Sequence, residues 1–278
     1  MFNSIASVLG YLLNFIYNFV NNYGLAIILF TLLVKLILLP ISISQQKTMK
    51  KSAKMQGELK ALQNKYGSDQ ERANREMMAL YKKNNMSPFS GCLSSIIQII
   101  LLLSVFYLVS RPLTYMKKVD LELVDKYKDE LSLKSNYPEV RIIKEKGADD
   151  ERVYLNMNFL GLDLSSVPSY NYKDVKVFII PILYVISSIV SMKMTLNMQQ
   201  GKNKNDKEEK EANPMPDMGK TMSYMMPIMA VSISLVAPLG LALYWLVNNV
   251  LMIGERIVLN KFIRDEEKEE NETENEQL

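Results

Sequence analysis

One lysine lies inside an apolar run near the start of the sequence. Residues 25–43 are apolar apart from Thr31, Lys35 and Ser42, and a run of this length can cross a hydrocarbon core. On insertion scales a lysine near the middle of such a span costs roughly 2.5–3.5 kcal/mol. The only acidic residue within the expected spans is Glu255, toward one end of the last span. We therefore expect Lys35 to lie in a polar, hydrated environment and to attract anionic groups.

Polar residues in the other apolar runs recur at spacings that place them on single helical faces. Such residues commonly form hydrogen bonds between membrane helices. Together with Lys35 they predict a water-filled groove within a helical bundle, although Trp245 is equally typical of an interfacial anchor. The candidate groove residues are Thr31, Lys35, Ser94, Gln98, Ser187, Ser191, Trp245 and Asn248.

The composition excludes several classes of enzyme. The 278 residues include no His and one Cys, Cys92. A Ser-His-Asp triad, an H-E-x-x-H zinc site, an intramolecular disulfide and a Cys₄ metal site are therefore impossible. The net charge of +3 does not indicate specific nucleic-acid recognition, and no P-loop is present. We expect no enzyme activity, no cofactor and no bound metal.

The elements that must position these residues follow from the alternation of apolar and charged stretches, which is typical of a polytopic membrane protein. The expected fold class is all-α, with five transmembrane helices, an interfacial amphipathic helix and a cytoplasmic helical hairpin. Pro238-Leu239-Gly240 predicts a tight turn between the last two spans. The expected segments are an amphipathic helix at 1–23, spans at 24–43, 89–110, 175–196, 220–237 and 239–260, a cytoplasmic hairpin at 44–88, an external segment at 111–174, a cytoplasmic loop at 197–219 and an acidic cytoplasmic tail at 261–278.

Residues 1–23 have polar positions on one helical face and apolar positions on the other, which predicts a helix lying in the outer membrane interface. A further spanning helix is the alternative. The expected apolar face comprises Ile5, Val8, Leu9, Leu12, Ile16, Phe19 and Val20.

Two other segments carry local signals. Ser68 and Glu71 have the spacing of a capping box, so the second helix of the 44–88 hairpin is expected to begin at Ser68. In the external segment, residues 119–133 are expected to be helical and residues 139–157 to form a small β-hairpin.

The basic residues set the expected orientation. Residues 44–88 hold ten Lys and Arg against four Asp and Glu, whereas no basic residue precedes Lys35. Because short basic loops remain in the cytoplasm, the N-terminus is expected outside and, after five crossings, the C-terminus inside. The basic hairpin is either a solvated structural element or a docking surface for a partner or for anionic lipid.

Several stretches, in order from about residue 20 to 262, resemble the YidC family of membrane-protein insertases. The stretches are Phe30-Thr31-Leu32-Leu33-Val34-Lys35-Leu36-Ile37-Leu38-Leu39-Pro40, Leu80-Tyr81-Lys82, Ser87-Pro88-Phe89-Ser90-Gly91-Cys92-Leu93 with Gln98, Asn158-Phe159-Leu160-Gly161-Leu162-Asp163-Leu164, and Pro238-Leu239-Gly240-Leu241-Ala242-Leu243-Tyr244-Trp245 with Asn248-Asn249.

The resemblance implies a hydrophilic groove that is open to the cytoplasm and to lipid and closed on the outside. The position of Lys35 is usually Arg in the family; Lys keeps the charge and loses the planar, bidentate guanidinium. The resemblance also implies a bacterial plasma-membrane protein whose partners are nascent membrane proteins and the lipid bilayer. Contacts of residues 44–88 with the Sec translocon and the ribosome are further expectations.

Two other classes of function remain open from the residues alone. A small-anion transporter or channel would use Lys35 as its binding charge, although no internal repeat of the kind common in transporters is present. An intramembrane Ser-Lys hydrolase would use Ser94 or Ser187 as nucleophile, but no local motif distinguishes one serine.

Overall fold

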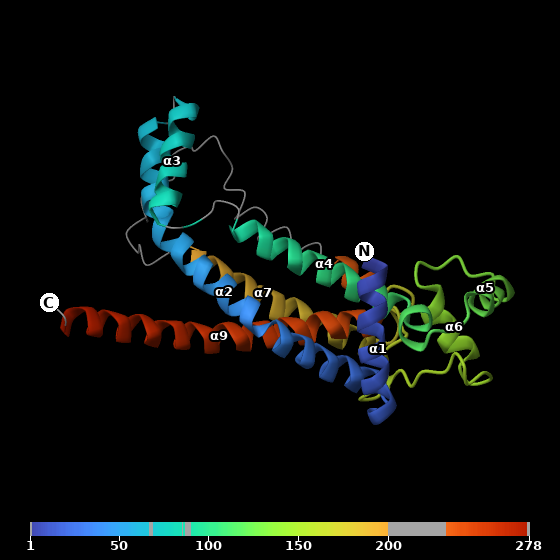
Figure 1. The fold of residues 1–278 in the computed structure, drawn as a ribbon. Helices are drawn as coiled ribbons and strands as arrows, with labels where there is room; N and C mark the ends of the chain where they lie inside the picture. Colours follow the sequence, from blue (N-terminus) through green and yellow to red (C-terminus); the bar gives the residue numbers. More distant parts are fainter. Residues whose placement is uncertain (1, 67–68, 85, 87–89, 200–231, 277–278) are drawn as a thin grey trace. The chain divides into compact units, whose positions relative to one another are not determined.

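The computed structural model describes residues 2–66, 69–84, 86, 90–199 and 232–276, which are mostly helical (Figure 1). By contacts the chain divides into two compact units. The first comprises Met1–Ile37, Gln98–Val190 and Tyr224–Met252, and the second comprises Leu38–Ile97, Ser191–Ser223 and Ile253–Leu278. The elements are α1 (Phe2–Val20), α2 (Tyr23–Tyr66), α3 (Gln70–Lys83), α4 (Ser90–Ser110), the π-helical turn η1 (Leu113–Lys117), α5 (Leu121–Glu130), α6 (Pro138–Lys146), β1 (Asn158–Phe159), β2 (Leu162–Asp163), the 3₁₀ turn η2 (Val175–Phe178), α7 (Ile179–Gln199) and α9 (Leu239–Glu276).

Three of the described helical stretches are long and apolar enough to cross a membrane. They are Tyr23–Met55, Val175–Asn197 and Leu239–Ile263. Helix α4 contributes the apolar stretch Ile99–Ser110, and several of its earlier side chains lie outside the described residues. The expected span at 220–237 lies largely outside the described residues. The prediction of a helical, multi-span membrane protein is therefore confirmed, while the number of five spans stays a prediction.

In the first unit, α1 lies across η1 at very short range. A Cβ atom placed on Gly10 would lie 1.8 Å from the carbonyl oxygen of Tyr115, so only glycine allows the two backbones to approach this closely. Leu113 and Met116 of η1 are almost completely buried in the same hydrophobic core. This contact fixes α1 to the start of the external segment.

The face of α1 that packs against the protein is largely separate from the apolar face expected in the membrane interface. The buried residues are Ala6, Gly10, Leu13, Ile16 and Tyr17, and of the expected apolar face only Ile16 is among them. Val8 and Phe19 of that face are exposed by 68% and 75%. Small residues on the packed face, Ala6 and Gly10, permit the close approach to η1.

The junction between α1 and α2 is held by the chain at residues 156–158. The Tyr17 hydroxyl accepts a hydrogen bond from the Asn156 backbone N–H at 2.9 Å, and the Asn22 side-chain amide donates to the Asn158 carbonyl at 2.7 Å. The Asn22 side-chain oxygen also accepts from the Leu25 N–H, which caps the start of α2.

The structure of residues 111–174, the segment expected to be external, corrects one expectation and confirms another. The helix α5 confirms helical structure within 119–133, but the β-hairpin expected at 139–157 is wrong because α6 occupies Pro138–Lys146. Proline at the first helical position and glycine just past the last are the usual signals of a helix start and stop. The hairpin lies instead at β1–β2, where Asn158 pairs with Asp163.

The break at Pro238 is present as expected. Residues 232–236 are helical, and α9 begins at Leu239. The start of α9 is held by the segment after β2, because the Gly240 N–H donates to the Leu164 carbonyl and the Leu239 N–H to the Ser166 carbonyl, each at 2.9 Å.

The helix α2 continues from its apolar part without interruption to Tyr66, and Pro40 lies inside the helix. Helix α3 follows, and the Gln63 side-chain amide of α2 lies 3.9 Å from the Met77 sulfur of α3. The N-cap of α3 is Asp69, whose carboxylate accepts from the Arg72 N–H at 3.0 Å, so the expected cap at Ser68 was wrong by one residue.

Candidate functional site

Helix α7 has the polarity of a membrane helix, with its polar side chains facing the protein. Ser187 and Ser191 are 8% and 6% exposed, while large apolar side chains of the same helix are exposed. In water this arrangement would expose a large apolar surface to solvent. In a bilayer it places the apolar side chains against lipid and keeps the hydroxyl groups away from the lipid. The exposed apolar residues of α7 are Ile179, Ile182, Leu183, Ile186, Ile189 and Val190.

On α2 the candidate residues Thr31 and Lys35 lie one helical turn apart. Thr31 is 2% exposed, and its hydroxyl donates to the Ile27 carbonyl at 2.6 Å, which satisfies the hydroxyl within the helix. Lys35 is partly exposed, and the apolar side chains of Leu36 and Ile37 beside it are exposed by 61% and 64%. The cation is therefore on a different side of α2 from its most exposed apolar surface.

In the first unit α7 and α9 meet through polar and aromatic side chains. The Ser187 hydroxyl donates to the Tyr184 carbonyl at 2.8 Å, and the Asn249 amide lies 3.5 Å from the same hydroxyl. The rings of Tyr184 and Trp245 are 5.7 Å apart between centroids. The Trp245 Nε1–H is buried without a hydrogen-bond partner among the described residues. A buried donor of this kind is available to an acceptor on a bound molecule.

The remaining candidate groove residues do not all lie in the same unit. Asn248 is half-buried on α9 in the first unit, and Ser191 belongs to the second unit. Ser94 and Gln98 are on α4, but their side chains lie outside the described residues. Thr31, Lys35, Ser187, Trp245 and Asn248 therefore share one unit, in which Asn249, the neighbour of Asn248, is the residue that contacts Ser187.

A further cation within an apolar helix, Arg256, was missed by the sequence reasoning. In the second unit its guanidinium donates to the Ser191 carbonyl at 3.2 Å and to the Thr195 hydroxyl, joining α9 to α7. The Gln46 side-chain amide lies 3.4 Å from the Arg256 carbonyl, which brings α2 to the same place. The available signal was an arginine next to Glu255 inside an otherwise apolar run.

Nothing in this arrangement forms a metal site within the part of the chain that the structure describes, since no three acidic or cysteine side chains gather there. The chemical groups observed are hydroxyl, amide, indole and cationic side chains of apolar helices, and these side chains point toward the interior of the protein. These features define a multi-pass helical membrane protein with polar groups in its interior.

Comparison with known proteins identifies the family. Residues 15–267 match the sequence profile of the family described as 60Kd inner membrane protein. The chain belongs to this family, and together with the apolar helices this makes it a multi-pass inner-membrane protein. The resemblance to the YidC family is confirmed.

Three relatives, each named "Membrane protein insertase YidC", show how far the similarity extends. The Citrifermentans bemidjiense protein is 28% identical over 95% of this chain and 38% of its own length. The Rickettsia felis protein is 30% identical over 94% of this chain and 39% of its own length. The Fusobacterium nucleatum protein is 24% identical over 94% of this chain and 97% of its own length. The chain thus spans less than half of the first two relatives and nearly all of the third.

Proposed function

We propose that the protein is a membrane-protein insertase that moves short polar tails of nascent membrane proteins across the bilayer and releases their hydrophobic segments into lipid. The observation that carries the proposal is the match of residues 15–267 to a family whose curated relatives are named as insertases. The activity is non-covalent, so it requires no catalytic residue.

The proposed path for the polar tail is a hydrophilic groove within the helical bundle. Support comes from the polar groups that face the interior in the first unit: Thr31, the contact between Ser187 and Asn249, and the buried Trp245 indole N–H. Moving a polar tail through hydrocarbon costs free energy, because each backbone group loses its hydration. A groove that reaches part of the way across the bilayer shortens the hydrocarbon path. The proposed groove residues are Thr31, Lys35, Ser94, Gln98, Ser187, Ser191, Trp245 and Asn248.

Lys35 is proposed to attract acidic residues of the tail. In a region of low dielectric constant a cation favours nearby carboxylates strongly at short range. Transfer of the client's apolar segment into lipid then supplies the driving force, at about 25 cal/mol per Å² of apolar area. Binding to Lys35 must remain weak enough for this transfer to release the tail.

The orientation and partners belong to the same proposal. We place the N-terminus outside and the C-terminus in the cytoplasm, because residues 44–88 are rich in Lys and Arg. The basic surface formed by the end of α2 and by α3 would then face the cytoplasm, where it is available to the ribosome or to the Sec translocon. No specific recognition of a nucleotide sequence is proposed.

The test is insertion of a single-span client with an acidic N-terminal tail into vesicles that contain the full chain. Protection of the tail from external protease reports translocation. We expect insertion to be retained with Lys35→Arg and to fall several-fold with Lys35→Ala. Lys193→Ala is the matched control, because Lys193 is an exposed lysine on the spanning helix α7.

The outcomes separate the activity from the role of the lysine. Insertion no greater than into empty vesicles would overturn the insertase proposal, and uptake of small anions would be measured next. Full insertion with Lys35→Ala would remove Lys35 from the mechanism and leave the activity standing. A client whose tail acids are replaced by amides should lose its dependence on Lys35.

A further inference from the structure

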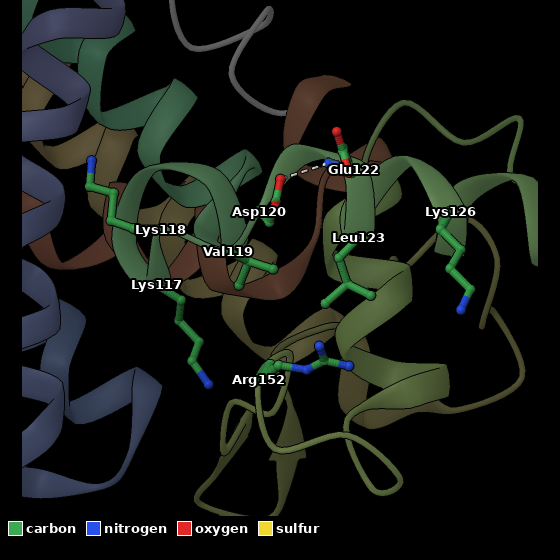
Figure 2. Close-up of a pocket in the computed structure, with 8 residues that line it drawn as sticks. All are labelled: Lys117, Lys118, Val119, Asp120, Glu122, Leu123, Lys126 and Arg152. Atoms are coloured by element: carbon green, nitrogen blue, oxygen red, sulfur yellow. Dashed lines mark hydrogen bonds between the residues drawn. The ribbon is translucent and has the colours of Figure 1, made fainter.

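A hollow of about 700 Å³ is lined by residues of the segment 111–174 and by none of α2, the helix that carries Lys35. Figure 2 shows four basic side chains around it, with Lys118 nearest α1 and Lys126 on α5. The charged residues that line it are Lys117, Lys118, Lys126, Arg152, Asp120 and Glu122.

The excess of positive charge at the hollow is local. Over residues 111–176 Lys and Arg number twelve and Asp and Glu also number twelve, so the segment as a whole is neutral. Ten of these twenty-four charged residues form ion pairs with one another, such as Lys144 with Asp163 at 2.9 Å and Arg152 with Asp150 at 2.7 Å. The ion pairs within residues 111–176 leave out Lys117, Lys118 and Lys126. These three lysines therefore keep charge that an external anion can neutralise.

Two of the three lysines are fixed by neutral oxygen atoms. The Lys117 ammonium donates to the carbonyl oxygens of Glu151 and Tyr154 at 2.9 and 2.8 Å. Burial lowers the pKa of Lys117, and the carboxylates of Glu151 and Asp150 oppose the shift from longer range. Burial also lowers the pKa of Lys118. A bound anion would favour the charged form of both groups.

Lys118 connects the hollow to the surface of α1. Its ammonium donates to the Ser7 hydroxyl and lies 4.5 Å from the centroid of the Tyr11 ring. Tyr11 belongs to an apolar stripe whose members are spaced along one side of the helix and are 61–75% exposed: Val8, Tyr11, Phe15 and Phe19. A helix that exposes such a stripe beside basic residues has the pattern of one that lies in the lipid interface.

The hollow therefore offers unneutralised cations beside a surface suited to acyl chains. We propose that it binds the phosphate headgroup of an anionic glycerophospholipid from the leaflet in which α1 lies. The positive charge of Lys117, Lys118, Lys126 and Arg152 attracts the phosphate to the hollow, and the exposed stripe of α1 contacts the acyl chains. Two carboxylates, Asp120 and Glu122, also line the hollow, so the four cations leave it a smaller but still positive net charge. The Asp120 carboxylate caps α5 by accepting the Glu122 N–H at 3.1 Å. Binding would tie the external segment to the bilayer.

The test uses the full chain in phosphatidylcholine vesicles with a trace of photoreactive lipid. The reactive group is on the glycerol of either phosphatidylglycerol or phosphatidylcholine, and adducts are mapped on peptides covering residues 112–134. We expect several-fold more adducts from phosphatidylglycerol than from phosphatidylcholine, and competition by unlabelled phosphatidylglycerol. Mapping by peptide separates this surface from the basic cytoplasmic region.

Lys126→Glu is the principal variant, because Lys126 is exposed and makes no hydrogen bond or ion pair within the described chain. We expect it to lower the phosphatidylglycerol adducts about fivefold or more. Lys118→Gln should lower them similarly. Lys134→Glu is the matched control, since it makes the same charge change at an exposed lysine of this segment outside the hollow. Unchanged circular dichroism establishes that each variant is folded.

Three results would overturn the proposal. Equal labelling by the two lipids would remove the preference for an anionic headgroup. An equal loss of phosphatidylglycerol adducts with Lys134→Glu would show that the adducts depend on the overall charge of the segment and not on the hollow. Competition by glycerol 1-phosphate as strong as that by phosphatidylglycerol would identify a site for a soluble phosphate compound rather than for lipid.

Discussion

The backbone of Gly10 lies so close to the carbonyl of Tyr115 that a Cβ atom at Gly10 would be 1.8 Å from the Tyr115 oxygen. The contact joins the first helix to a turn more than a hundred residues later. Because the atom nearest to Gly10 is the backbone oxygen of Tyr115, a larger residue at position 10 could not be accommodated by rotation of a Tyr115 side chain.

Gly10→Ala is therefore expected to separate α1 from η1. The expected loss of stability is about 1–3 kcal/mol, as for other small-to-large changes in packed regions. Thermal unfolding of the full chain in detergent, followed by circular dichroism, measures the effect. Val8→Ala, an exposed site on the same helix, should change the midpoint little. A midpoint unchanged by Gly10→Ala would show that α1 is not held by this contact.

Glu139 makes the stability of the external segment depend on pH. Burial raises the pKa of Glu139, although hydrogen bonds from the N–H and hydroxyl of Thr114 and the charge of Arg111 partly oppose this. The folded state thus binds the proton more tightly than the unfolded state. Its contribution to stability is full below the unfolded pKa and is lost as pH rises through the folded pKa.

Replacement of Glu139 by Gln should flatten this pH dependence. The measurement is the thermal midpoint between about pH 4 and pH 8, a range that brackets an ordinary and a raised carboxyl pKa. Glu151→Gln, at an exposed carboxylate of the same segment, should leave the wild-type profile in place. A profile that keeps its slope in Glu139→Gln would assign the pH dependence to another group.

Arg256 is expected to be a structural cation. Arg256→Ala removes its hydrogen bonds to Ser191 and Thr195 and leaves these acceptors buried, at a cost of about 1–3 kcal/mol. Unfolding in a denaturing detergent mixture reports the change. Lys261→Ala, at an exposed residue farther along α9, is the control. Equal stability of the two variants would contradict the structural role.

The β1–β2 turn gives a prediction about backbone conformation. Leu160 and Gly161 have φ values of 50° and 78°, as a two-residue hairpin turn requires. Gly161→Ala should destabilise the turn by about 1–2 kcal/mol, because a side chain disfavours this region. Leu160→Asn should be tolerated or slightly stabilising, since asparagine adopts positive φ more easily than leucine. Limited proteolysis of residues 156–166 measures both effects, and faster cleavage of Leu160→Asn would contradict the assignment.

The sequence indicated the membrane spans because their apolar residues are continuous along the chain. Apolar runs, the break at Pro238 and the polar spacing on α7 all depend on neighbours along the chain, and they correspond to helical structure in the described residues. Composition likewise excluded histidine chemistry, and the ordered stretches carry the resemblance to the family.

Two features of the fold did not follow from the sequence patterns used. The buried face of α1 could not be chosen from its own residues, because η1 selects small side chains such as Gly10. The hairpin expected at 139–157 failed for a different reason, since Pro138 and Gly147 were helix signals that alternation obscured.

The sequence by itself therefore determined that this is a helical membrane protein with a cation, Lys35, in its first apolar run. The tertiary structure decided which polar groups meet. The contact of Ser187 with Asn249, the anchoring of Arg256 on α7 and the gathering of lysines beside α1 each join segments far apart in the sequence. Helical periodicity assigns a residue to a face, but the partner of that face depends on how the chain packs in three dimensions.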